Sequence, residues 1–360
     1  MRFSATGSQG DGADHEECGQ AHLDNGGRSE AIVGPTDVGH GAPARKGDVT
    51  ASPGYSTATM TRPWHAERPI TAEFARSLIR ARFPDIAAER VEPLGSGWDN
   101  TAFLVDGTLV FRFPHKPSAA ALLETEARVL PAIAPRLPLA VPHPRWVGGP
   151  DDAFPWPFVG YPLLPGRPAC TLALPAEARA AAAPALGEFL ARLHAIPTAG
   201  LPLPGDTLER TNFRTRMLLL EARLAVLAER GAIEDAAPWR ALFRRLPEAA
   251  PARAPALVHG DLYACHLLVG ERGAVSGVID WGDVHAGDRA VDLMLLYAFL
   301  PPAARDELLR AYGAVDARDL RVARLRAAFH SVSLAWSALE RGDDALLAEA
   351  LLAMRFVLEE

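Results

Sequence analysis

The spacing of apolar residues changes along this 360-residue chain, and that change limits its fold more than any other feature. In the first half, β-rich runs from Thr101 to Val105 and from Thr108 to Phe113 flank Asp106-Gly107, a dipeptide that favours a hairpin turn. In the second half, apolar residues recur at helical spacing, as at Leu186, Phe189, Leu190 and Leu193. We therefore expect an α+β fold with a small β-rich part and a larger, mostly helical part.

Composition limits the partners and the compartment. The net charge is −7 and the pI is near 5.9, which argues against a nucleic-acid partner because binding the phosphate backbone needs a basic face. The most apolar stretch, Leu293 to Leu300, is too short to cross a bilayer, and the N-terminus lacks the apolar core of a signal peptide. Cys18, Cys170 and Cys265 are too few and too scattered to predict a disulfide framework or a cysteine metal site. We expect a monomeric, cytoplasmic protein with no membrane partner.

Two aspartates are brought together by a predicted hairpin in the helical half. The apolar pair Leu257-Val258 leads into His259-Gly260-Asp261, and the second of two β-rich runs that follow ends at Asp280. Phosphoryl transfer needs a carboxylate that takes a proton from the attacking hydroxyl, and oxygen ligands that hold Mg²⁺ against the nucleotide phosphates. Asp261 suits the first role and Asp280 the second, so the spacing predicts a phosphotransferase site.

The same residues carry a family resemblance. His259-Gly260-Asp261 followed by Ile279-Asp280-Trp281 resembles the motifs of the aminoglycoside and macrolide phosphotransferase family, whose members share the protein-kinase fold. The resemblance implies a two-lobed protein-kinase-like fold, ATP or GTP as phosphate donor, Mg²⁺ as cofactor and a small-molecule hydroxyl as acceptor. It also implies that Asp261 is the catalytic base and that Asp280 is a metal ligand.

The expected domain organisation follows from this resemblance and from local composition. Residues 1–60 are rich in Gly, Ser, Asp, Ala and His, which predicts a disordered tail. We expect a β-rich N-lobe that binds nucleotide at 61–158, and a helical C-lobe for catalysis and substrate binding at 159–360.

His266 departs from the family pattern. It stands five residues after Asp261, where many members have an Asn that serves as a second metal ligand. Histidine is a poorer Mg²⁺ ligand than an oxygen donor, so His266 is a candidate for contact with either the metal or the substrate. We expect His259 to organise the loop, and Asp292 resembles the structural aspartate of the family.

The nucleotide-binding candidates lie in the β-rich half and in the strand that follows it: Gly95, Ser96, Gly97, Arg112, Glu126, Tyr161 and Leu163. The glycines let backbone N–H groups approach a phosphate, although a plain turn explains them as well. A kinase fold needs a strand cation paired with a helix glutamate; an exposed strand arginine and a solvent-facing glutamate are the alternatives. Backbone groups of Tyr161 to Leu163 are expected to read a purine edge, unless this is only a buried edge strand.

Several functions are compatible with this site. The leading hypothesis is transfer of the nucleotide γ-phosphate to an antibiotic, with His266 and Arg112 resembling the macrolide branch. A metabolic alcohol is a second class of acceptor. A catalytically silent, kinase-like nucleotide-binding protein is another alternative, and a metal-dependent hydrolase that uses His259, Asp261, His266 and Asp280 ranks last. Carboxylates beside Asp261 would favour aminoglycosides as acceptors, and apolar side chains would favour macrolides.

Overall fold

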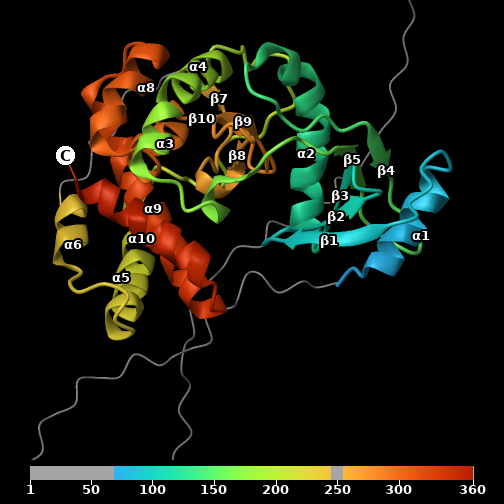
Figure 1. The fold of residues 1–360 in the computed structure, drawn as a ribbon. Helices are drawn as coiled ribbons and strands as arrows, with labels where there is room; N and C mark the ends of the chain where they lie inside the picture. The colour runs from blue at the N-terminus through green and yellow to red at the C-terminus, as the bar shows by residue number, and fades with distance from the viewer. Residues whose placement is uncertain (1–68, 245–253, 360) are drawn as a thin grey trace, which may run out of the picture. The chain divides into compact units, whose positions relative to one another are not determined.

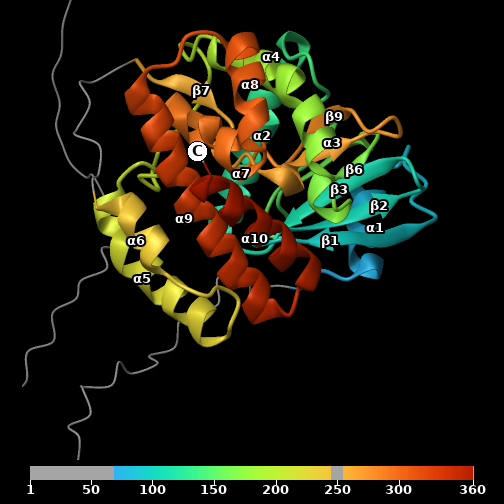
Figure 2. The same cartoon turned by 60° about the vertical axis from the view of Figure 1, so that its left-hand side comes forward.

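The computed structural model describes residues 69–244 and 254–359. The disordered tail expected at 1–60 lies outside the described residues. Figure 1 and Figure 2 show a β-sheet with its own helices at one end of the described chain and a group of helices at the other. The predicted α+β class is confirmed.

An antiparallel sheet of five strands forms the N-terminal part, in the order β1-β2-β3-β5-β4. Its strands are β1 (Val91–Ser96), β2 (Asn100–Val105), β3 (Leu109–Pro114), β4 (Trp146–Gly148) and β5 (Phe158–Pro162). The boundary expected between residues 158 and 159 falls inside β5, which pairs with both β3 and β4.

The hairpin predicted at Asp106-Gly107 is confirmed, because β2 and β3 pair from Val105↔Leu109 onward. Asp106 and Gly107 have φ values of 49° and 70°. This left-handed backbone matches the twist of the flanking strands and is tolerated best by Asp, Asn and Gly.

Two helices accompany the sheet. The first, α1 (Ala72–Arg82), is capped by Thr71, whose hydroxyl accepts a hydrogen bond from the Phe74 N–H at 3.1 Å. The second, α2 (Pro117–Ile133), follows β3 directly and packs beside β3 and β5 (Figure 1). Aromatic side chains fill the core on the α1 side, with the rings of Phe113 and Phe158 stacked 4.8 Å apart.

Helices dominate the rest of the chain and bury two large apolar clusters. In Figure 2 the helices α9 and α10 run side by side, and α5 packs against α9. The α-helices are α3 (Ala176–Ala181), α4 (Ala183–His194), α5 (Phe213–Glu229), α6 (Ala237–Phe243), α7 (Leu295–Ala298), α8 (Arg305–Tyr312), α9 (Ala317–Arg341) and α10 (Asp344–Leu358). Short 3₁₀ helices are η1 (Ala134–Arg136), η2 (Ala169–Thr171), η3 (Ala264–His266), η4 (Arg289–Met294) and η5 (Pro302–Ala304). No helix of the described ranges is long and apolar enough to cross a membrane.

Small strands within the helical part position the site. The predicted hairpin is present as β8 (Leu267–Val269) and β9 (Val275–Val278), and β6 (Arg167–Pro168) adds to its edge. The strand β7 (Ala256–Val258) pairs instead with β10 (His285–Gly287). Asp261 therefore lies just after β7 of one small sheet, whereas Asp280 lies just after β9 of the other.

Candidate active site

The loop that carries Asp261 is held by buried hydrogen bonds to Asp292. The Asp292 carboxylate is fully buried and accepts the backbone N–H groups of His259 at 2.7 Å and Gly260 at 2.9 Å. His194 Nε2 lies 3.2 Å from the same carboxylate. Burial alone would raise the pKa of Asp292, but the His194 hydrogen bond and the backbone donors lower it. Asp292 therefore fixes the backbone of the loop just before Asp261.

His259 and Gly260 fix the turn just before Asp261. His259 Nε2 lies 3.0 Å from the Ile279 carbonyl, and its Nδ1 accepts the Asp261 N–H at 3.3 Å. Gly260 has φ +88°, and a Cβ there would lie 2.4 Å from the Asp283 carbonyl oxygen. Only glycine fits this turn without displacing the backbone.

The Asp261 carboxylate is surrounded by nitrogen atoms. Its Oδ1 lies 3.3 Å from His330 Nε2 and 3.8 Å from Arg326 Nη2, and its Oδ2 lies 3.8 Å from His266 Nδ1. Burial would raise the pKa of Asp261, but the hydrogen bond from His330 and the neighbouring positive charges outweigh it and hold the pKa below its usual range. The side chain is 29% exposed, so an ionised carboxylate faces solvent at this point.

Asp280 lies on the other side of His266. The His266 Nε2 atom is 3.3 Å from Asp280 Oδ2, and its Nδ1 is 2.7 Å from the Asp261 carbonyl oxygen. Burial would lower the pKa of His266, but hydrogen bonding to Asp280 and the charges of both aspartates raise it to about 9. Asp280 itself has φ +63°, a strained value for a residue other than glycine and one that is concentrated at functional sites. The predicted approach of the two aspartates is present, with His266 between them.

Asp280 fits the role of a Mg²⁺ ligand. Its side chain is 46% exposed and offers carboxylate oxygens, which Mg²⁺ prefers. In the described parts of the chain, no three His, Cys, Asp or Glu side chains are arranged to hold a metal ion by themselves. Mg²⁺ takes one or two protein carboxylates where nucleotide phosphates and water complete its shell, so Asp280 suffices for that kind of site. His266 as a ligand stays a prediction.

Arg112 joins β3 to α2 and to Asp280. Its Nη1 donates to both Glu126 oxygens, at 2.8 and 2.7 Å, and its Nη2 donates to Asp280 Oδ1 at 2.6 Å. The side chains of Arg112 and Glu126 are 7% and 0% exposed. The structure thus brings together the strand cation, the helix glutamate and one of the two aspartates. Tyr161 is buried beside Arg112, and the burial raises the pKa of its phenol.

The stretch Gly95-Ser96-Gly97 ends β1 and enters the turn to β2. The Gly97 N–H donates to the Asn100 carbonyl at 3.0 Å. A Cβ at Gly95 would meet nothing within 4 Å, and one at Gly97 would meet only the Asn100 carbonyl, at 3.9 Å. Packing among the described residues therefore does not require glycine at either position. The space beside both glycines is open to another molecule.

The expected purine-reading groups need a correction at Leu163. Its N–H donates to the Thr108 carbonyl at 2.8 Å, so that amide is already used within the sheet. Tyr161 likewise stands opposite Val110 in the β3–β5 pairing. Because hydrogen-bonding groups alternate between the two sides of a strand, the Pro162 carbonyl points away from β3.

Comparison with known proteins agrees with this geometry. A family model described as the phosphotransferase enzyme family matches residues 90–330, well over half of the chain. The chain belongs to the phosphotransferase enzyme family. The matched range includes both aspartates, the Arg112–Glu126 pair and most of α9.

Named proteins that are similar to this chain support the family assignment. The aminoglycoside 3'-phosphotransferase of Escherichia coli is 31% identical over 159 residues, which cover 39% of this chain and 52% of that protein; the chain thus spans about half the length of that curated relative. The structure of the GDP complex of wild-type aminoglycoside 2'-phosphotransferase-IIIa is 27% identical, has a TM-score of 0.59, and covers 80% of this chain and 99% of that one. The GDP and kanamycin complex of APH(2")-IIia gives 27% identity and a TM-score of 0.58, with 80% and 98% covered. The two-lobed, kinase-like α+β fold is confirmed.

Sequence reasoning missed several residues of this candidate site. His330 and Arg326 lie in the middle of α9, where no motif marks them, yet both approach Asp261. Arg210 is also buried at the site, and its Nε donates to the Gly260 carbonyl at 3.1 Å. Only the helical spacing of Arg326 and His330, four residues apart, hinted that they share one face.

The cysteine prediction was wrong for two of the three residues. Cys170 and Cys265 form a disulfide, with their Cα atoms 4.8 Å apart and a separation of 95 positions in sequence. The bond ties η2, after β6, to η3 in the loop that follows Asp261. A pair this distant in sequence carries no local signal. Cys18 lies outside the described residues.

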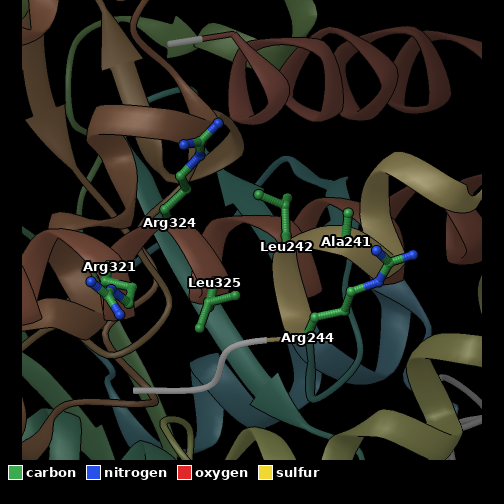
Figure 3. Close-up of a pocket in the computed structure, with 6 residues that line it drawn as sticks. All are labelled: Ala241, Leu242, Arg244, Arg321, Arg324 and Leu325. Atoms are coloured by element: carbon green, nitrogen blue, oxygen red, sulfur yellow. The ribbon is translucent and has the colours of Figure 1, made fainter. Parts of the chain in front are cut away.

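A separate hollow of about 500 Å³ lies between α6 and α9 (Figure 3). Its lining includes Arg244, Arg321 and Arg324, and none of the residues around Asp261 takes part. Arg324 there donates to the carbonyls of Val357 and Leu358 at the end of α10. The hollow is distinct from the candidate site around Asp261.

Proposed function

We propose that this protein transfers the γ-phosphate of ATP or GTP to a hydroxyl group of a small molecule. The observation that carries the proposal is a continuous line of contacts from Glu126 through Arg112 to Asp280, and on through His266 to Asp261. It links the predicted nucleotide side of the site to the predicted catalytic base. Catalysis of this kind depends mainly on such positioning and on neutralisation of charge.

In the proposed reaction, Asp261 accepts the proton of the acceptor hydroxyl while the hydroxyl oxygen bonds to the γ-phosphorus. The bond from that phosphorus to the β-γ bridging oxygen breaks, and the nucleoside diphosphate leaves with the bond's electrons. Asp280 would hold Mg²⁺, which neutralises phosphate charge when it is bound. Arg112 is fixed by its two carboxylate partners and provides a cation close to that position.

The rest of the N-lobe provides candidate nucleotide contacts. We propose that backbone N–H groups of Gly95, Ser96 and Gly97 approach the phosphates, because the space around both glycines is open. Tyr161 is proposed to lie beside the purine, and the Pro162 carbonyl takes the hydrogen-bonding role first expected of Leu163. GDP in the two similar solved structures supports a guanine or adenine nucleotide as donor.

The acceptor of the relatives suggests an antibiotic hydroxyl here as well. The kanamycin complex and the aminoglycoside 3'-phosphotransferase support that class. A metabolic alcohol is the alternative acceptor. We further propose a monomer that acts in the cytoplasm, where nucleoside triphosphates are abundant.

The test is a transfer assay with ATP and with GTP, in Mg²⁺ and in EDTA. Kanamycin, a macrolide and simple alcohols serve as acceptors, and product is measured by mass spectrometry. The proposal expects a phosphorylated product that requires Mg²⁺ and nucleotide and is lost in Asp261→Asn. Tight nucleotide binding without any product would instead support the catalytically silent alternative. Hydrolysis that needs metal but no nucleotide would support a metal-dependent hydrolase.

A further inference from the structure

Arg326 and His330 on α9 lie beside Asp261, and further arginines follow on the side of α9 that packs against α5. Nη2 of Arg326 on α9 lies 3.8 Å from Asp261 Oδ1. The positive charge of Arg216 on α5 repels that of Arg326. Arg223 lies two turns further along α5, and the positive charge of Arg216 repels it as well. We call Arg216, Arg223 and Arg326 the arginine cluster. The cluster extends from the catalytic carboxylate along the packed pair α5 and α9.

Aromatic rings and fixed acceptors hold the cluster in place. The guanidinium carbons of Arg216 and Arg223 lie 5.0 and 5.5 Å from the centroid of the Phe329 ring. Arg223 also lies 5.0 Å from the Trp336 ring centroid and donates a hydrogen bond to Ser333 Oγ. Cations stacked on rings in this way lose little further freedom when they bind an anion.

Carboxylates do not neutralise the cluster. Within the described ranges, no carboxylate oxygen lies within 4 Å of the Arg216 or Arg223 guanidinium, and Arg326 reaches only Asp261. At longer range the charge of Asp206, which is itself paired with Arg210, and the smaller effect of the exposed Glu209 act on Arg216. In the proposed reaction Asp261, the carboxylate near Arg326, also receives the acceptor hydroxyl. The three arginines of the cluster therefore keep a net positive charge when a substrate is bound.

Other acidic groups near Asp261 are already paired. Arg210 bonds to Asp206 at 2.5 Å and also donates to Asp283. Its side chain is only 6% exposed, so the two carboxylates face a buried cation. They are not arranged as a free acidic surface for a polycation.

Desolvation and mutual repulsion act on the cluster. Burial, followed by the charge of Arg216, lowers the pKa of Arg223 to about 10. Burial also lowers the pKa of Arg326 to about 10, although Asp261 opposes the shift. The Nε atoms of both residues are buried and have no hydrogen-bond partner among the described residues. An anion nearby would relieve these costs, whereas another cation would add to them.

We propose that the acceptor carries a carboxylate or phosphate group that pairs with the arginine cluster while its hydroxyl reaches Asp261. Polycationic aminoglycosides are then poor acceptors. This inference rests on the proposed phosphotransferase function and narrows its substrate class. Arginine is suited to the role because its planar fork binds carboxylate and phosphate oxygens in pairs.

The transfer arm of the test compares three groups of hydroxyl compounds with ATP and Mg²⁺: hydroxycarboxylates and sugar phosphates, uncharged sugars, and aminoglycosides including kanamycin. We expect product mainly from the anionic group. In Arg216→Gln and in Arg223→Gln, KM for such an acceptor should rise about tenfold or more, with a smaller change in kcat. Arg214→Gln, an exposed position on the same helix, is the matched control and should leave KM unchanged. Phosphorylation of kanamycin as fast as of any anionic acceptor overturns the inference and leaves the proposed function standing.

The binding arm separates the two proposals. Titration calorimetry measures 3-phosphoglycerate, which carries hydroxyl, carboxylate and phosphate groups, and the anionic acceptors of the transfer arm against the ADP-loaded protein. We expect binding by wild type and Arg214→Gln that is lost in the Arg216→Gln/Arg223→Gln double variant, whose melting temperature shows whether it folds. Anion binding through the cluster without transfer to any acceptor would support the anion site and reject the phosphotransferase function. No binding of any of these anions would overturn the inference.

Discussion

The Asp261 carboxylate is kept ionised by neighbours that lie far from it in sequence. His330 Nε2 is 3.3 Å from its Oδ1, and the side chain of Tyr263 packs between the rings of His330 and His266. Burial lowers the pKa of His330, so the neutral imidazole is the form that donates this hydrogen bond. We infer that His330 positions the Asp261 carboxylate and helps to keep it ionised.

Removal of His330 should weaken catalysis and shift its pH dependence. We expect His330→Ala to lower kcat by about tenfold, since a lost hydrogen bond to a charged group costs about 1.5–3 kcal/mol. Without that bond the pKa of Asp261 rises toward its usual range, so the fall in activity on acidification moves to higher pH. The measurement is kcat and KM from about pH 3 to about pH 7, a range that includes the usual pKa of a carboxyl group.

His330→Gln keeps an N–H donor and is the matched comparison. It should recover part of the rate and most of the pH profile. A His330→Ala enzyme with an unchanged pH profile and a raised KM alone would show that His330 contacts the acceptor and does not position Asp261.

At the scale of elements, Arg112 connects β3, α2 and the strand end at Asp280. Arg112→Met should destabilise the protein by about 3–5 kcal/mol, because it leaves the fully buried Glu126 without its partner. Urea unfolding measures this change. The double variant Arg112→Met/Glu126→Leu should recover much of the stability and still bind ADP poorly. Full ADP affinity in the double variant would contradict a nucleotide role for the pair.

The disulfide connects η2 to η3, in the loop that follows Asp261. Cys170→Ser should lower the free energy of unfolding by about 2–4 kcal/mol, since the bond closes a long loop. Dithiothreitol should destabilise wild type by a similar amount and have no further effect on the variant. Cys18→Ser, which leaves this bond intact, is the control. Equal stability of wild type with and without reductant would contradict a stabilising role.

The sequence predicted those elements whose signals are local. The Asp106-Gly107 hairpin and the β8–β9 hairpin follow from turn residues within a few positions. The pairing of β7 with β10 was missed because β10 has three residues and its partner lies across the intervening hairpin. Long-range contacts such as Cys170–Cys265 and His330–Asp261 depend on tertiary packing, which one sequence does not display.

At the scale of the whole molecule, a buried ion pair joins α3 to α10 near the end of the chain. Arg179 donates to the two Glu349 oxygens at 2.9 and 2.5 Å, and the side chains are 0% and 5% exposed. Glu349→Ala should destabilise the protein by about 3–5 kcal/mol because it leaves a buried cation unpaired. Glu188→Ala breaks the exposed pair with Arg192 and should change stability too little to measure. Equal effects of the two variants in urea unfolding would show that Arg179–Glu349 is not a structural tie.

The placement of Asp261 as the base of phosphoryl transfer is tested most directly by single-turnover transfer with wild type, Asp261→Asn and Asp283→Asn, together with ADP affinity. Asp283 is the matched comparison, since it is a nearby aspartate that already pairs with Arg210. We predict that Asp261→Asn slows transfer by about a hundredfold or more while ADP affinity is retained, and that Asp283→Asn slows it far less. Transfer by Asp261→Asn at the wild-type rate, or a larger loss in Asp283→Asn, would contradict this assignment.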